Sequence, residues 1–182
     1  MSTSISEKKA VLFHPGDELP QRADYLWQIV SGVVKSCTVS EEGTSVTLGF
    51  WGRDDLVGST LSNVAPYDLK CISNVRAIAV HRSEWEEVSR NLLYSAQQTQ
   101  QLLFIVRNTR IAKRLWLLLK WLASKFGRGI QEGNLIDFQL THQELADAIN
   151  TTRITVTKTL NQFEREGLIL RPRTRCIIIK HG

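Results

Sequence analysis

The stretch that most constrains this chain of 182 residues is LTHQELADAINTTRITVTKTLNQFEREGLI at 140–169, because it predicts two short helices joined by a tight turn. Thr141 is placed to cap the first helix, with Glu144 as its reciprocal partner in a capping box. Apolar residues then recur at three- and four-residue spacings in the second helix, which Gly167 ends. The apolar face of that second helix is predicted to hold Ile154, Val156, Leu160 and Phe163.

The outward side of the second helix carries cationic or hydroxyl-bearing side chains, namely Arg153, Thr155, Thr157 and Lys158. Contacts to base edges and phosphates require such groups, so the pattern predicts a helix-turn-helix that binds double-stranded DNA. The alternative is an ordinary αα-hairpin whose solvent-exposed face carries Arg and Lys. A basic turn, RPRTR at 171–175, follows between two strand signals, which is the order of a winged helix-turn-helix and makes Arg173 a candidate DNA contact.

Charge is distributed unevenly along the chain, whose net charge is +5. Residues 1–111 hold 11 Lys and Arg against 12 Asp and Glu, a balance of −1, whereas residues 112–182 hold 12 against 6, a balance of +6. The positive charge therefore belongs to the part that contains the helix-turn-helix, as expected of a domain that binds a polyanion.

Residues 10–80 alternate short apolar runs with turn residues. Turn signals such as PGD, SG, EG and WGRDD separate runs at 25–30, 33–39, 45–50 and 71–80, each of which is expected to form one strand. This pattern predicts an antiparallel barrel or jelly roll, an architecture that does not by itself define a ligand.

A long helix is expected next, capped by Asn91 and starting at Leu92. Its residues Leu92, Ala96, Thr99, Leu103, Val106 and Arg110 have the rhythm of a coiled-coil seam, which predicts a dimerisation helix. The alternative is a helix packed on its own barrel, with Phe104 and Ile105 making that contact. Residues 114–122 are apolar enough to be the first core helix of the DNA-binding domain. The boundary then falls within helix, which gives three expected parts, 1–90, 91–112 and 113–182.

Taken together, these features resemble the Crp/Fnr superfamily of bacterial transcription regulators. The superfamily signature matches 140–169 without a gap, and TRITVTK at 152–158 is similar to the nitrogen-control (NtcA-like) branch. YLWQIVSGVVK at 25–35 and DDLVG at 54–58 are similar to the sensory β-roll of the same superfamily. The resemblance implies an α+β chain with an N-terminal antiparallel β-roll, a jelly roll like cyclic-nucleotide-binding domains, then a long dimerisation helix and a C-terminal winged helix-turn-helix. It also implies a cytoplasmic homodimer that binds a palindromic operator and contacts RNA polymerase.

The resemblance also assigns positions on DNA. It places Arg153, Ile154 and Lys158 at the three principal base-facing positions. The phosphate-facing positions are Thr141, His142, Thr152 and Thr155. Cyclic-AMP receptors carry a Glu where this chain has Ile154, which accepts no hydrogen bond and favours contact with a thymine methyl group.

The effector expected from the resemblance is a small molecule other than cyclic AMP. Members that bind cyclic AMP hold its phosphate with a helix N-terminus and an Arg, but Ser59 replaces the Glu of that cassette, and no Arg lies between Arg53 and Arg76. Lys70 is the remaining cation that could substitute for the Arg. The nitrogen-control branch implies a 2-oxoglutarate-like metabolite, and a protein without an effector is the alternative. The candidate effector contacts are Val57, Gly58, Ser59, Thr99, Gln100, Arg107 and Arg110.

Other classes of protein are not expected. The three cysteines lie far apart without a C-x-x-C, and the four histidines show no i,i+4 pair, so neither a disulfide framework nor a metal site is predicted. No stretch approaches the roughly 18 uninterrupted apolar residues of a membrane span. P-loop, G-x-S-x-G and H-E-x-x-H motifs are absent, so no enzyme is predicted. An effector-binding module without DNA function remains the alternative to a transcription regulator.

Overall fold

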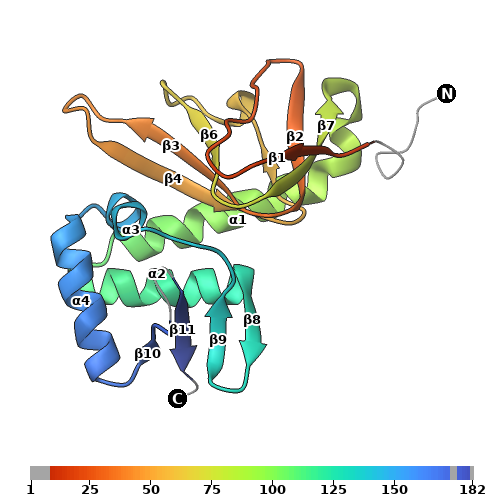
Figure 1. Ribbon diagram of the computed structural model, residues 1–182. Helices are drawn as coiled ribbons and strands as arrows, with labels where there is room; N and C mark the ends of the chain where they lie inside the picture. The colour runs from red at the N-terminus through yellow and green to blue at the C-terminus, as the bar shows by residue number, and fades with distance from the viewer. Residues whose placement is uncertain (1–8, 173–175, 181–182) are drawn as a thin grey trace. The chain divides into compact units, whose positions relative to one another are not determined.

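The computed structural model describes residues 9–172 and 176–180 (Figure 1). Contacts between Cα atoms divide the chain into two units, residues 1–100 and 101–182. The first unit consists mainly of antiparallel strands, and the second combines helices with a small antiparallel sheet. The expected α+β order of β-roll, long helix and winged helix-turn-helix is confirmed.

The first unit is a β-roll built from two antiparallel sheets with the strand orders β1-β7-β2-β5 and β4-β3-β6. Its strands are β1 Val11–Phe13, β2 Tyr25–Ser31, β3 Val34–Val39, β4 Ser45–Trp51, β5 Leu56–Val57, β6 Asp68–Cys71 and β7 Val75–His81. In Figure 1, β3 and β4 form a hairpin that extends beyond the other strands. Since side chains alternate between the faces of a strand, one face of each sheet supplies the core. The core residues are Leu19, Trp27, Ile29, Val34, Trp51, Val57, Leu69, Cys71, Val75 and Ala77.

The apolar run at 71–80 was expected to be one strand, and this expectation is wrong. The chain bends after Cys71, the last residue of β6, and β7 begins at Val75. At the bend, Ser73 Oγ accepts a hydrogen bond from Val33 N at 2.9 Å. A Cβ atom on Gly32, which has a φ of +89°, would lie 2.1 Å from the carbonyl oxygen of Asn74. This close approach depends on pairing with a distant segment, so local alternation does not reveal the break.

The long helix α1 spans Ser89–Val106 and follows a 3-10 helix, η3 at Arg82–Val88. Asn91 lies inside α1 instead of capping it, and its side-chain amide donates to the carbonyl oxygen of Asp54 at 2.6 Å. The helix does not continue into the next one, because Arg110 has extended φ and ψ angles and is the N-cap of α2. The expected boundary at 112/113 lies in the first turn of α2, whereas the two compact units divide between Gln100 and Gln101, within α1.

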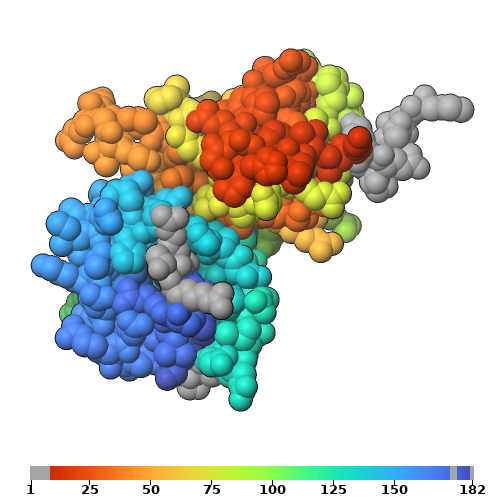
Figure 2. All heavy atoms as spheres, in the orientation of Figure 1, coloured from red at the N-terminus to blue at the C-terminus, as the bar shows by residue number. Residues whose placement is uncertain are grey.

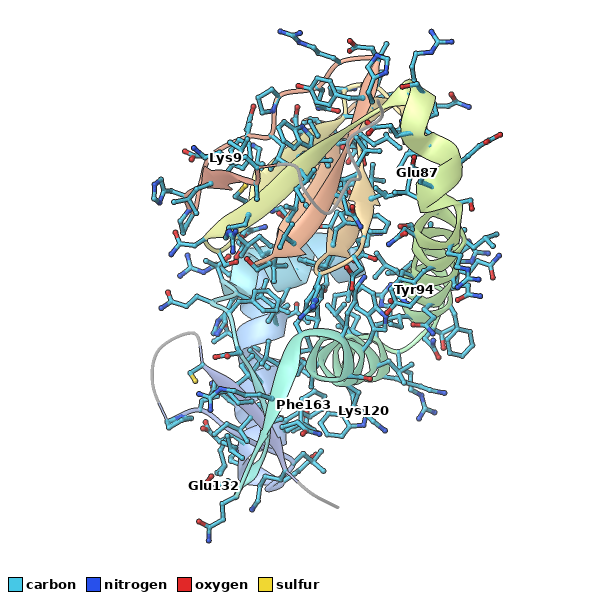
Figure 3. The ribbon with its side chains drawn as sticks, turned by 90° about the vertical axis from the view of Figure 1, so that its right-hand side faces the viewer. Lys9, Glu87, Tyr94, Lys120, Glu132 and Phe163 are labelled. Atoms are coloured by element: carbon cyan, nitrogen blue, oxygen red, sulfur yellow. The ribbon has the colours of Figure 1, made fainter. Side chains whose placement is uncertain are left out.

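The second unit is organised around α2, Ile111–Phe126, which contacts α3, α4, β8, β9 and β11. The other elements are β8 Gly127–Ile130, β9 Gly133–Ile136, α3 His142–Ile149, α4 Arg153–Arg165, β10 Ile169–Leu170 and β11 Ile177–Lys180. The strands form one antiparallel sheet in the order β10-β11-β9-β8. Leu115, Leu118 and Leu122 of α2 are fully buried, which confirms the expected core helix. The ring of Trp116 packs edge-on against that of Phe163 in α4, with centroids 5.6 Å apart. Figure 3 labels Phe163.

None of the helices in the described part of the chain combines the length and the apolarity that crossing a membrane requires.

Candidate nucleic-acid interface

The first helix of the predicted motif, α3, begins with the expected capping box. Glu144 N donates to Thr141 Oγ1 at 3.1 Å, and Thr141 N donates to a Glu144 carboxylate oxygen at 2.7 Å. Each side chain therefore satisfies a backbone N–H group that the helix leaves unpaired. Leu145 and Ile149, one turn apart, are fully buried, so α3 is fixed on one side by packing and at its start by hydrogen bonds.

The turn between α3 and α4 uses a left-handed residue and a second cap. Asn150 has a φ of +52°, and Thr151 N donates to the carbonyl oxygen of Ala146 at 3.1 Å. Thr152 then caps α4, because its Oγ1 accepts from Thr155 N at 3.2 Å. The two caps hold α3 and α4 in the arrangement of a helix-turn-helix.

The second helix, α4, has one buried and one exposed side. Val156 and Leu160 are fully buried and Phe163 is 5% exposed. Ile154 is 68% exposed, so its expected place on the buried face is wrong, and it lies instead with the exposed Arg153 and Lys158. Figure 2 shows atoms of this helix, in blue, on the outer surface. Two cations and one apolar side chain are thus available to a partner.

The hydroxyl-bearing residues of α4 are engaged within the motif. Thr155 Oγ1 lies 2.9 Å from Thr152 Oγ1 at the start of the helix. Thr157 Oγ1 donates to the carbonyl oxygen of Arg153 at 2.9 Å and lies 2.7 Å from His142 Nδ1. His142 therefore links the first turn of α3 to α4. Burial lowers the pKa of His142, and the charges of Arg171 and Arg153 lower it further.

Arg171 joins α4 to the segment that follows β10. Its Nε donates to a carboxylate oxygen of Glu164 at 3.1 Å, its Nη2 donates to the same oxygen, and Nη2 also donates to Asn161 Oδ1 at 2.6 Å. The hydrogen bond from Arg171 holds the pKa of Glu164 below its ordinary value. Arg173, the wing residue predicted to contact DNA, lies outside the described residues.

The predicted effector residues fall in several places. Val57 is part of the β-roll core, Gly58 is buried against Leu26, and Ser59 starts a three-residue 3-10 helix, η2 at Ser59–Leu61. Thr99 lines a cavity of about 330 Å³ inside the first unit, together with Leu92, Ser95 and Ala96 of α1. Gln100, Arg107 and Arg110 are exposed and are not among the residues that line this cavity.

Sequence reasoning missed several residues that the fold brings to the cavity and to Arg171. Trp51 and Tyr67 line the cavity, but they are 16 positions apart in the chain and belong to β4 and to the loop before β6. The partners of Arg171 lie 7 and 10 positions away, across the end of α4. Within the described ranges, no cluster of three or more His, Cys, Asp or Glu side chains is placed to hold a metal ion.

We expect acidification to destabilise the fold through His142. Because its pKa is lowered by folding, the unfolded chain binds the proton first, and the free energy of unfolding falls as the pH drops from about 6.5 through the lower folded-state pKa. Denaturant titrations of wild type and His142→Gln between about pH 7.5 and pH 5 measure this, and the variant should show a shallower loss. The exposed His14→Gln serves as the control. Equal slopes for wild type and His142→Gln would contradict the assignment.

Comparison with known proteins matches both units. Residues 6–91 match the family described as the cyclic nucleotide-binding domain, and residues 109–181 match the Crp-like helix-turn-helix domain. The regulatory protein CysR of Synechococcus elongatus is 38% identical over 166 residues, which cover 90% of this chain and 80% of that protein. A global nitrogen regulator of the same organism is 28% identical over 179 residues, covering 90% of this chain and 79% of that protein.

A solved structure shares the fold. The crystal structure of a CRP-family transcriptional regulator from Thermus thermophilus matches with a TM-score of 0.80 at 20% identity, covering 94% of this chain and 92% of that chain. The resemblance inferred from the helix-turn-helix and β-roll motifs is thereby confirmed. The chain belongs to the Crp/Fnr superfamily of transcription regulators, and its helix-turn-helix is a DNA-binding domain.

Proposed function

We propose that this regulator acts as a homodimer that reads a palindromic operator through α4 and responds to a small effector. The observation that carries the proposal is the outward side of α4, where Arg153, Ile154 and Lys158 are exposed while the opposite side is buried. A helix that presents cations and a methyl-contacting side chain suits the major groove of B-DNA. In a two-fold dimer the two copies of α4 enter successive major grooves about 34 Å apart.

The bases follow from the chemistry of the exposed side chains. Arg153, in the first turn of α4, donates two hydrogen bonds to guanine O6 and N7. Ile154 accepts no hydrogen bond, so it favours a thymine methyl group over the cytosine amino group. The half-site therefore keeps a guanine opposite Arg153 and has an A·T pair next to it. Its sequence is closer to GTA than to GTGA. Thr141 and Thr152, which cap α3 and α4, lie where backbone N–H groups face phosphate.

Replacing Arg153 by Ala should remove the preference for that guanine and weaken specific binding by roughly 1–3 kcal/mol. Selection of binding sites from random duplexes at fixed salt measures both effects. Arg165→Ala is the matched control, because it removes an exposed cation from the far end of the same helix. Lys158→Ala separates a base contact from a phosphate contact, since loss of a phosphate contact weakens binding equally on every sequence. If wild type enriches no palindrome, or Arg153→Ala enriches the same guanine, the assignment of Arg153 fails.

Arg171 is proposed as a positioning residue for the wing. Its planar guanidinium binds Glu164 and Asn161 of α4 at once, and the basic turn at 171–175 starts from it. Lys has a single ammonium group and lacks this fork. The basic turn follows Arg171 in the chain, so release of Arg171 would remove the described contacts that join α4 to the segment after β10.

Arg171→Lys should therefore lower DNA affinity about tenfold on specific and random duplexes alike, because a wing on phosphates carries no sequence preference. Mobility shifts on both duplexes measure the loss. Arg165→Lys, at an exposed arginine of α4, should leave both affinities within about twofold. A loss restricted to the specific duplex, or no loss at all, would show that Arg171 does not position the wing.

The dimer interface is proposed along the exposed side of α1. Leu93 is 69% exposed and Leu103 is 58% exposed, and Ala96 and Gln100 lie between them in steps of three and four. Leu92, the expected first residue of the seam, instead packs against the buried cluster of Leu26, Leu56, Val80 and Val88. We therefore propose a seam that starts one residue later than expected, at Leu93. Ile105 is buried and Phe104 is 69% exposed, so only one of this pair suits an intramolecular contact.

Leu103→Glu should convert the dimer into a monomer, because it places a carboxylate opposite its own copy in a two-fold interface. Light scattering measures the mass, and a mobility shift should show the accompanying loss of operator binding. Leu12→Glu is the matched control, since Leu12 is 56% exposed and lies on β1. A Leu103→Glu protein that remains dimeric rules out this seam.

The remaining parts of the proposal rest on the family. The match to the cyclic nucleotide-binding domain supports a small effector, and the resemblance to the nitrogen-control branch implies a 2-oxoglutarate-like metabolite rather than cyclic AMP. The relatives are named as bacterial regulators, which supports a non-enzymatic role in the cytoplasm and a contact with RNA polymerase.

A further inference from the structure

The cavity of the first unit is bounded by strands, a loop and α1, and it is partly open to solvent beside the exposed Leu61 and Val64. It has a volume of about 330 Å³, which lies within the usual range for small-molecule sites. Its lining comes from β3, β4, β5, the segment 61–67 and one side of α1. Leu92, Ala96 and Thr99 lie on that side of the helix, so a bound molecule touches α1 directly.

Every described residue that lines the cavity is uncharged. Lys70, the cation considered as a substitute for the missing Arg, pairs in register with Lys35, while its neighbour Leu69 pairs with Ser36, which lines the cavity. Because neighbours in a strand point to opposite faces, Lys70 faces away from Ser36. Lys70 Nζ instead lies 3.6 Å from a carboxylate oxygen of Glu18.

A cyclic phosphate does not fit this lining. The family match implies a cyclic nucleotide, whose phosphate needs a fixed cation or the N-terminus of a helix. Here the segment after β5 is a 3-10 helix of only three residues, and Arg53 is exposed beside Asp54. A dicarboxylate such as 2-oxoglutarate meets the same lack of a counter-charge, since an unpaired ionised group in an apolar site is strongly disfavoured.

The polar groups of the cavity form a neutral network. Trp51 Nε1 donates to Ser36 Oγ at 2.8 Å, and the Tyr67 hydroxyl also hydrogen-bonds Ser36. Burial raises the pKa of Tyr67, so the cavity disfavours the negatively charged phenolate form of this side chain. On the α1 side, Thr99 Oγ1 donates to the carbonyl oxygen of Ser95 at 3.1 Å. Apolar walls with a few neutral hydrogen-bonding groups suit an apolar ligand that carries one or two uncharged polar atoms.

We infer that this cavity is the effector site and that it takes a small, uncharged, largely apolar molecule rather than a cyclic nucleotide or a carboxylated metabolite. This inference rests on the proposed effector-controlled function and names its ligand class. Such a ligand gains its affinity from apolar area removed from water. Its contact with Leu92, Ala96 and Thr99 places it against the helix whose exposed side forms the proposed dimer seam.

A pair of probes of similar shape tests the charge preference in the full-length protein. N-Phenyl-1-naphthylamine is neutral, and 8-anilino-1-naphthalenesulfonate adds a sulfonate to the same ring system. Fluorescence titration should show one saturable site per chain for the neutral probe and about tenfold or weaker binding of the sulfonate. Cyclic AMP and 2-oxoglutarate should not displace the neutral probe.

A matched pair of variants places the probe. Val64 is 46% exposed and lines the cavity, whereas Val39 is 45% exposed and does not line it. Val64→Arg should reduce the preference for the neutral probe about tenfold by supplying a counter-charge, and Val39→Arg should leave both affinities unchanged.

Three results would overturn the inference: equal binding of the two probes by wild type, displacement of the neutral probe by cyclic AMP or 2-oxoglutarate, or the same response from both variants. A mobility shift on the selected operator runs in parallel. If wild type binds the operator but does not discriminate between the two probes, the proposed ligand class is refuted and the proposed function stands. If wild type does not bind the operator, the proposed function is refuted.

Discussion

The burial of one side of α4 is the constraint on which the second unit depends. Val156, Leu160 and Phe163 are buried, and each large apolar side chain removed from water contributes about 1.5–3 kcal/mol. Turning the helix by one residue, about 100°, would expose this side. The burial therefore fixes which residues face outward, and it does so before any DNA is present. Arg153 and Lys158 face outward because the opposite side of the helix is occupied.

The helix α1 carries two different surfaces. Leu92, Ser95 and Thr99 line the cavity of the first unit, whereas Leu93 and Leu103 are exposed to solvent. Ala96 belongs to both surfaces. A ligand in the cavity and a second copy of the chain would therefore act on the same turns of one helix. A ligand shifts an equilibrium only through differential contact with two states, and α1 is where such contact is available.

The sequence by itself determined the local features of the DNA-binding motif. Thr141 with Glu144, and Thr152 with Thr155, are caps whose partners lie three residues away, so their spacing is readable without the fold. Three further features can also be recognised without the fold. They are the period of apolar residues in α3 and α4, the core helix α2 and the positive charge of the second half. Ile154 is the exception, because its apolar side chain suggested a buried position and its exposure suits a contact with DNA.

Only the tertiary structure decided the features that depend on distant segments. At the break between β6 and β7, the backbone of Asn74 lies close to Gly32, and Leu92 packs into the cluster with Leu26 and Val80, which leaves Leu93 as the start of the proposed seam. The neutral lining of the cavity likewise assembles Ser36, Trp51 and Tyr67 from three places in the chain. Periodicity identifies which residues share a face of one element, but burial against other elements decides what that face meets. The sequence therefore determined the helix-turn-helix, and the tertiary structure decided the cavity and the exposed side of α1.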